Sequence, residues 1–493
     1  MVSQEKGLPD SFTPGKRKRT TGVDLATTEN VKWAARLGSE NYSTPVVAGG
    51  RVYVGTNDDD IGDPKYQSTE GGVLKCLDEA TGKLVWKLVV PRTDRHENKK
   101  WLFDNMGLGI CSTPAVDGDR VYVVTNRCEV VCLDVNGMAN GNQGFQDEGH
   151  YSVAFGAPPV TPGPTDADIL WRFDMVSQLP SQPHDAANCS VLVEGDLVYV
   201  CTSNGVEKGG ITVPYPKAPS LIALDKYTGR LAAADDEKIG TRLFHGQWSS
   251  PSAGKVSGRT LIFFGAGDGV CYAFQHVTSP LPEGCVPLQK VWSYDCDPPD
   301  FRSKDGKPID YWSGDAREHK GNTGDGTYAG PCEIIATPVF YRNRVYVAIG
   351  QDPRHGRGRG VLHCIDATRT GDITGTGKIW SYDKLDRSLS TVSIAGGLLY
   401  IADYAGKIHC LDAETGQCYW VHETKAEIWG STLVADGKVY IGTQKSFITL
   451  AAGREKKLLG EVRVGSPIWA SPIAANGVLY VTSQKYLWAV AKP

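Results

Sequence analysis

One strand motif occurs eight times in the sequence, and this repetition restricts the fold more than any other feature. Each copy is a short apolar run with an aromatic residue near its centre, as in RVYVGT and KVYIGT. The eight aromatic residues are Tyr53, Tyr122, Tyr199, Phe263, Tyr346, Tyr400, Tyr440 and Tyr480. The last three are 40 residues apart, the length of a four-stranded propeller blade. Longer spacings earlier in the chain indicate insertions in the earlier blades.

Every repeat contains the same short segments in the same order. A segment around a triplet such as STP, at Ser43 and Ser112, precedes a glycine-containing turn and the aromatic strand. A CLD or ALD segment, a TG turn and, in most copies, a strand ending in Trp follow. Alternating apolar positions between glycine turns predict four antiparallel strands rather than helices. We therefore predict an all-β fold, an eight-bladed β-propeller of four-stranded antiparallel blades whose edges are hidden by radial closure.

The two ends of the chain carry incomplete repeats that complement each other. Residues 31–38, VKWAARLG, have the pattern of a fourth strand, and no first three strands precede them. Residues 486–492, YLWAVAK, have the pattern of a third strand with no fourth after it. We expect the N-terminal strand to close blade eight. The predicted organisation is an N-terminal tail over residues 1–30 and a single propeller domain over residues 31–493.

The turn after the third strand has its own signature. DEATGKLVW at Asp78 recurs as DAETGQCYW at Asp412, where the TG pair suits a tight turn with a positive-φ residue. The Trp is expected to pack between neighbouring blades. This pattern resembles the tryptophan-docking repeat of pyrroloquinoline quinone (PQQ)-type propellers, a family of quinoprotein alcohol dehydrogenases and related non-catalytic propellers. The resemblance covers almost the whole chain from Val31 and implies the fold, whereas activity is a separate question.

Bulk properties exclude several classes of function. The net charge of -4 provides no basic field for nucleic acid. No run of about 18 apolar residues is present, so we expect no transmembrane segment. The start, MVSQEKGLPDSF, has no apolar stretch of signal-peptide type, which fits either a cytosolic protein or one that has lost a leader. The family resemblance, in contrast, implies a periplasmic or secreted location.

The 13 cysteines give no zinc-site pattern. Cys76, Cys132, Cys364 and Cys410 recur just before LD or ID and are expected to act as small buried hydrophobes. A disulfide between Cys410 and Cys418 stays open as an alternative in an oxidising compartment.

Long insertions gather on one predicted face of the ring. Loops joining the fourth strand of a blade to the first strand of the next share a face with loops joining strands two and three. Function is usually carried by such loops on a rigid scaffold. Residues just before each STP-like triplet are expected to surround the axis on this face.

These axial positions give the candidate site residues. The candidate catalytic residues are His184, His245, Glu333 and Arg387, and the candidate cofactor- or ligand-binding residues are Tyr42, Asn188, Gln247, Trp248, Trp429 and Trp469. Indole rings stack on planar ligands, arginine clamps carboxylates, and His and Glu transfer protons or bind metal. A metal site formed by His184, His245 and Glu333 is one alternative, and ordinary loop hydrogen bonding is the other. Tryptophans that merely plug the channel are also compatible with the pattern.

Two other loops carry weaker signals. Asp58, Asp59, Asp60 and Asp63 offer calcium-type oxygen ligands, but a solvated acidic loop is the preferred interpretation. HGRGRG at His355 has the composition of a flexible basic loop.

Three functions fit these observations. The leading hypothesis is a quinoprotein-like oxidoreductase acting on alcohols or sugars, with PQQ and calcium as implied cofactors. The chain departs from that family because it has no adjacent cysteine pair and its calcium ligands cannot be assigned. The second is a binding or assembly scaffold without PQQ, with an envelope protein as partner. The third is a lyase or hydrolase of uronate-containing glycans, using His184, His245, Arg387, Trp248 and Trp429.

Overall fold

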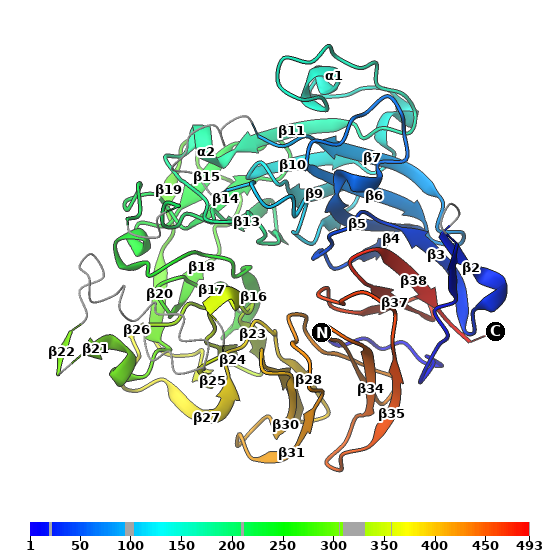
Figure 1. The fold of residues 1–493 in the computed structure, drawn as a ribbon. Helices are drawn as coiled ribbons and strands as arrows, with labels where there is room; N and C mark the ends of the chain where they lie inside the picture. Colours follow the sequence, from blue (N-terminus) through cyan, green and yellow to red (C-terminus); the bar gives the residue numbers. More distant parts are fainter. Residues whose placement is uncertain are drawn as a thin grey trace.

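The structure is a computed structural model that describes residues 1–18, 22–93, 103–208, 212–304, 306–308, 331–355 and 357–492. Eight antiparallel sheets of four strands stand around a common axis (Figure 1). Two of them gain a short parallel fifth strand, β19 (Val286–Pro287) in blade three and β26 (Gly371–Asp372) in blade four. The prediction of an eight-bladed all-β propeller is confirmed.

The blades follow one another along the chain. Blade one consists of β4 (Val46–Ala48), β5 (Arg51–Asn57), β6 (Gly72–Asp78) and β7 (Leu84–Val90). Blade two consists of β8 (Ala115–Asp117), β9 (Arg120–Val124), β10 (Glu129–Asp134) and β11 (Ile169–Asp174). Blade three consists of β12 (Leu192–Glu194), β13 (Leu197–Cys201), β14 (Leu221–Asp225) and β15 (Leu231–Ala234), and blade four of β16 (Ser252–Val256), β17 (Arg259–Gly265), β18 (Val270–Gln275) and β20 (Lys290–Asp295). Blade five consists of β23 (Val339–Tyr341), β24 (Arg344–Ala348), β25 (Arg359–Asp366) and β27 (Lys378–Asp386). Blade six consists of β28 (Ser393–Ala395), β29 (Leu398–Ala402), β30 (Lys407–Asp412) and β31 (Cys418–Glu423). Blade seven consists of β32 (Leu433–Ala435), β33 (Lys438–Gly442), β34 (Phe447–Ala451) and β35 (Leu458–Val462).

Blade eight is built from both ends of the chain. Its strands are β36 (Ile473–Ala475), β37 (Val478–Thr482), β38 (Tyr486–Val490) and β3 (Val31–Arg36), in that order. Strand β3 pairs antiparallel with β38, with Ala34 opposite Trp488. Closure of the ring by the N-terminal strand is therefore confirmed, and Figure 1 shows the blue and red ends of the chain in one sheet.

Tryptophans join six of the eight blades to the blade that follows. Six rings donate a hydrogen bond from Nε1 to a backbone carbonyl of the following blade: Trp33 to Glu79, Trp86 to Val135, Trp171 to Lys226, Trp292 to Ala367, Trp380 to Ala413 and Trp420 to Gly453. For four of these rings, a turn glycine of the following blade lies against the indole: Gly82 at Trp33, Gly137 at Trp86, Gly229 at Trp171 and Gly416 at Trp380. At Gly416, for example, φ is +75° and an added Cβ would lie 2.7 Å from the Trp380 ring. The TG turn thus supplies both the backbone conformation and the space for the neighbouring indole.

We expect the substitution Gly416→Ala to lower the free energy of unfolding by about 2–3 kcal/mol, because it adds a steric clash to an unfavourable left-handed backbone. Gly396→Ala is the matched control, since Gly396 also has a positive φ of 58° but open space around its Cα. Its cost is the backbone strain alone, about 1 kcal/mol. Urea unfolding of both variants measures the difference, and equal losses would show that the Trp380 contact contributes nothing.

The first residues of the chain pack on blades seven and eight. Leu8 and Phe12 are buried in one cluster with Tyr440 and Trp488. Tyr440 donates its hydroxyl to the carbonyl of Pro9. The basic residues Lys16–Lys18 form β1, which pairs with β2 (Gly22–Asp24). The boundary between tail and propeller domain at residue 30 stays a prediction.

None of the 13 cysteines forms a disulfide in this structure, and Cys410 and Cys418 are included in this set. Cys76, Cys132, Cys364 and Cys410 are completely buried, as small hydrophobic residues would be. No helix in the described part of the chain combines the length and apolar character needed to cross a membrane.

Candidate functional site

A cavity of about 180 Å³ opens on the face that carries the long loops. Most of its lining comes from segments that join the last strand of one blade to the first strand of the next; the exceptions, Asp352 and Pro353, come from the β24–β25 loop. The lining residues are Tyr42, Met106, Leu108, Cys111, Asp185, Ala186, Asn188, Trp248, Ile335, Asp352, Pro353, Leu389 and Trp429. We call this cavity the axial funnel. It lies where the repeat register placed the candidate residues.

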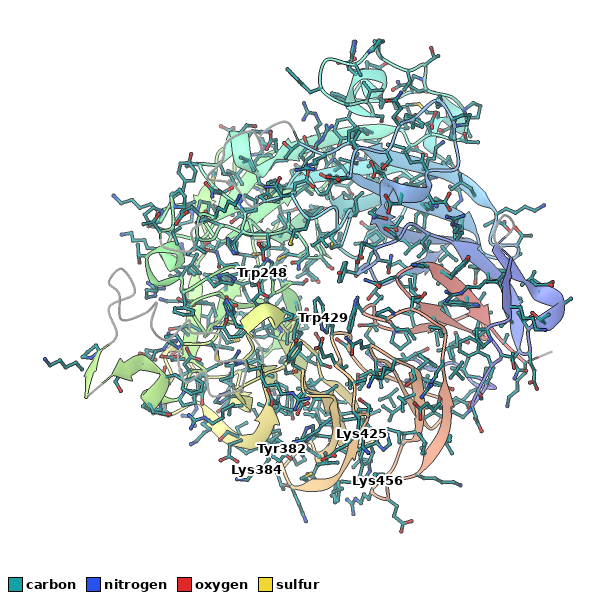
Figure 2. The ribbon with its side chains drawn as sticks, in the orientation of Figure 1. Trp248, Tyr382, Lys384, Lys425, Trp429 and Lys456 are labelled. Atoms are coloured by element: carbon teal, nitrogen blue, oxygen red, sulfur yellow. The ribbon has the colours of Figure 1, made fainter. Side chains whose placement is uncertain are left out.

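Aromatic rings form one wall of the axial funnel. Trp429 stacks on Trp469 with ring centroids 4.7 Å apart, and the ring centroid of Tyr42 lies 5.8 Å from that of Trp429. Trp469 supports Trp429 from behind and is not itself among the described lining residues. Trp248 comes from the β15–β16 loop, and Figure 2 shows it and Trp429 near the centre of the ring.

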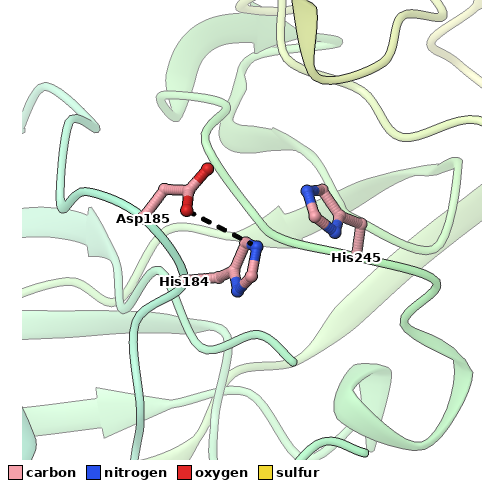
Figure 3. Close-up of side chains that lie close together, drawn as sticks. All are labelled: His184, Asp185 and His245. Atoms are coloured by element: carbon pink, nitrogen blue, oxygen red, sulfur yellow. Dashed lines mark ion pairs between the residues drawn. The ribbon is translucent and has the colours of Figure 1, made fainter. Parts of the chain in front are cut away.

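A buried polar cluster borders the funnel beside Trp248. The rings of His184 and His245, each 4% exposed, have centroids 4.3 Å apart. The Nδ1 atom of His184 lies 2.8 Å from the carbonyl oxygen of Val206, which fixes Nδ1 as the donor. Its Nε2 lies 3.7 Å from Oδ1 of Asp185 (Figure 3). The Nε2 atom of His245 lies 3.2 Å from Oδ2 of Asp352.

Glu333 braces this cluster without lining the funnel. Its carboxylate accepts hydrogen bonds from the backbone N–H groups of Gly246 at 3.2 Å and of Asp352 at 3.1 Å. It therefore ties the loop that carries His245 to the loop that carries Asp352.

Arg387 and Gln247 also lie behind the described lining. Arg387 is 1% exposed and donates from Nη1 to the carbonyl oxygen of His355. Gln247 donates to the carbonyl oxygen of Asn204 and to the hydroxyl of Ser220. Of the candidate residues, Tyr42, Asn188, Trp248 and Trp429 line the axial funnel, and His184 and His245 border it.

Sequence reasoning missed three residues of the cluster. Asp185 and Asp352 are buried and line the funnel, and the ring of His355 lies 4.6 Å from that of His245. The interpretation of HGRGRG as only a flexible basic loop is wrong for His355. The sequence did carry a signal for two of these residues. Asp352 and His355 lie in a long loop between the second and third strands of blade five, and such loops were expected on the functional face.

Burial sets the protonation of two side chains at the site. The pKa of His245 lies well below its ordinary value, first because the ring is buried and second because His184 is close. The imidazole is therefore neutral near neutral pH. Burial raises the pKa of the Cys111 thiol to about 12, so this lining cysteine is not a thiolate nucleophile.

The acidic loop at residues 58–63 does not form a calcium cage in the described structure. Asp58 accepts hydrogen bonds from Ser68 and Thr69, Asp60 pairs with Arg36, and Asp63 pairs with Lys87. Within the described ranges, the one group of three or more closely spaced metal-ligating side chains is His184, Asp185 and His245.

Comparisons with known proteins agree with the repeat pattern. A PQQ-type family model described as "Outer membrane protein assembly factor BamB" matches residues 69–139, 327–421 and 358–492. A quinohemoprotein alcohol dehydrogenase from Comamonas testosteroni is 32% identical over 126 residues, which is 22% of this chain and 16% of that protein. The chain thus matches only a small part of that relative.

Solved structures resemble the whole ring. BamB from Moraxella catarrhalis matches with a TM-score of 0.54 at 13% identity, covering 94% of this chain and 97% of that one. A europium-containing methanol dehydrogenase matches with a TM-score of 0.56 at 12% identity, covering 94% and 93%. A quinohemoprotein alcohol dehydrogenase from Pseudomonas putida HK5 matches with a TM-score of 0.53 at 14% identity, covering 94% and 77%. At these identities the likeness establishes the fold alone.

Proposed function

We propose that the axial funnel of this eight-bladed propeller binds a small planar or carboxylated ligand and that the protein acts on this ligand as an enzyme. A PQQ-type family model matches part of the chain, which supports the proposal. One observation carries the proposal: an aromatic wall and a buried cluster of ionisable side chains border the same cavity. Burying His and Asp side chains is unfavourable unless they are paired or used. Such groups beside a concave site are typical of catalysis.

The chain's own residues have separable parts in this function. Trp429, held by Trp469, offers a flat face to a planar ligand, and Trp248 borders the funnel at the polar cluster. Asp352 is a carboxylate at the wall, positioned by His245 and by the Glu333-bound backbone, and it is placed to accept a proton from a ligand hydroxyl.

PQQ fits this site in one respect only. The aromatic wall suits its flat ring system, but PQQ carries three carboxylates, and no Lys or Arg occurs among the described lining residues. Asp185 and Asp352 would add like charges instead. We therefore derive no step through PQQ or calcium.

The more specific candidate within this proposal is an oxidoreductase acting on alcohols or sugars, and the dehydrogenase structures of the same fold favour it. A uronate lyase would need a cationic side chain to bind the carboxylate of its substrate. Arg387, the candidate for this role, lies behind the wall, and it is not among the described lining residues.

A scaffold with an envelope-protein partner is the competing proposal, supported by the match to the BamB-type model. A scaffold would be expected to expose an apolar rim. Exposed large apolar side chains such as Phe155, Tyr227 and Leu458 instead belong to separate blades. A periplasmic or secreted location stays a proposal from the family resemblance.

Calorimetric titration with 2-naphthoate, a planar carboxylated probe, and with PQQ tests the proposal. We expect one naphthoate site per chain, and we expect Trp429→Ala to weaken it about tenfold, because an aromatic stacking contact contributes about 1–1.5 kcal/mol. Phe155→Ala is the matched control and should leave binding unchanged, because Phe155 is 86% exposed and lies in the segment between β10 and β11, which we call the blade-two insertion. Absence of naphthoate and PQQ binding, with an intact fold, would favour the scaffold.

A further inference from the structure

The polar cluster beside the funnel has the composition of a transition-metal site. His184, Asp185 and His245 each offer one ligand atom, and these atoms lie within 4.8 Å of one another. Two ligands on a tetrahedral ion with bonds of about 2.0–2.1 Å are about 3.4 Å apart. The distance of 3.7 Å between His184 Nε2 and Asp185 Oδ1 is already close to this value. Figure 3 shows the three side chains converging from two loops.

Contacts to the second ring nitrogen of each histidine prepare both imidazoles for coordination. Metal-bound histidines usually donate their other ring N–H to a carbonyl or carboxylate. His184 does so from Nδ1 to the carbonyl oxygen of Val206, which leaves the lone pair on Nε2. His245 contacts the Asp352 carboxylate through Nε2. Its Nδ1 is buried and has no hydrogen-bond partner among the described residues, so its lone pair is available.

The backbone at Asp185 provides an independent observation. Asp185 has a φ of +57°, a left-handed conformation that Asp and Asn adopt more readily than other residues with a Cβ. Here it places a buried carboxylate next to His184 and at the wall of the axial funnel.

We propose that His184, Asp185 and His245 bind one first-row divalent transition-metal ion, such as zinc or iron(II), with an open coordination position toward the axial funnel. Two imidazoles and one carboxylate suit these ions, whereas calcium prefers an all-oxygen set. The inference deepens the proposed function and rests on it for the role of the ion. In that role the ion would add positive charge beside Asp185 and Asp352 and so strengthen the binding of a carboxylated ligand.

The test is metal binding to the full chain after treatment with a chelator. Equilibrium dialysis with zinc is expected to give one ion per chain with a submicromolar Kd, and cobalt(II) is expected to give the visible absorption of a four- or five-coordinate site. Asp185→Asn and His245→Ala should each weaken zinc at least about 100-fold, since each removes a direct ligand. Asn tolerates the left-handed backbone at position 185, so this variant keeps the fold testable. Excess calcium should not displace the ion.

His150→Ala is the matched control, because His150 is exposed and lies on the blade-two insertion. Its zinc binding should equal that of the parent chain. Failure to bind zinc, cobalt(II) or iron(II) stoichiometrically, or binding that Asp185→Asn and His245→Ala leave unchanged, would overturn the metal site. Naphthoate binding to the chelator-treated chain reports on the proposed function separately. If the ion engages the ligand, zinc should tighten that binding about tenfold, and Asp185→Asn should remove the gain.

Discussion

Replacing Trp33 with alanine is expected to lower the free energy of unfolding by about 3–5 kcal/mol, the usual cost of truncating a buried tryptophan. Trp33 is 3% exposed, donates a hydrogen bond of 2.8 Å to Glu79 and packs against Tyr480. It lies on β3, the strand that completes blade eight, and it contacts blade one. It thus acts at the one seam where the ring is closed by segments from opposite ends of the chain.

Urea unfolding followed by circular dichroism measures this effect. Trp429→Ala is the matched control, because it removes the same side chain from a half-buried position in the funnel. We expect it to cost about 1 kcal/mol, since little buried area is lost. Similar losses in the two variants would contradict the assignment of Trp33 as the closing contact.

The fold could be predicted because its determinants are local and repeated. Each blade carries the same aromatic strand and, in most copies, the same TG turn, so weak signals in one repeat are reinforced by the others. The unpaired strand at Val31 and the incomplete last repeat then required closure by the N-terminus. What the pattern did not show was the packing of Leu8 and Phe12 on the last blades, because residues 1–30 lie outside the repeat.

The candidate site could be predicted only to the level of position along the chain. The repeat register placed Trp248 and Trp429 at the axis, but consecutive side chains point in different directions. Gln247 therefore binds Asn204 and Ser220 behind the wall, while its neighbour Trp248 lines the funnel. Asp352 and His355 were missed because they belong to a loop between strands two and three, whose path no repeat specifies.

Asp104 provides the second large expected effect, and it depends on pH. Burial raises the pKa of its carboxyl to about 7, although Thr93, Asn126, Arg127 and Arg92 each lower it. In the unfolded chain this pKa is about 3.9. Between these values the folded protein holds a proton that the unfolded chain has released, so stability falls as the pH rises from about 4 to about 7. Above pH 7 the carboxylate is ionised in both states, and the folded protein is destabilised by the full free energy of burying this charge.

The substitution Asp104→Asn should remove this cost. We expect the free energy of unfolding to rise by about 2–4 kcal/mol at pH 8 and to change little near pH 3, where the carboxyl is mostly protonated in both states. The amide can still accept the hydrogen bond from the backbone N–H of Thr93. Its NH₂ group can also donate to Oδ1 of Asn126, which is buried without a partner among the described residues. Urea unfolding of both proteins across this pH range is the measurement. A difference that does not grow with pH would mean that Asp104 is ionised in the folded protein throughout, because charged partners outweigh its burial.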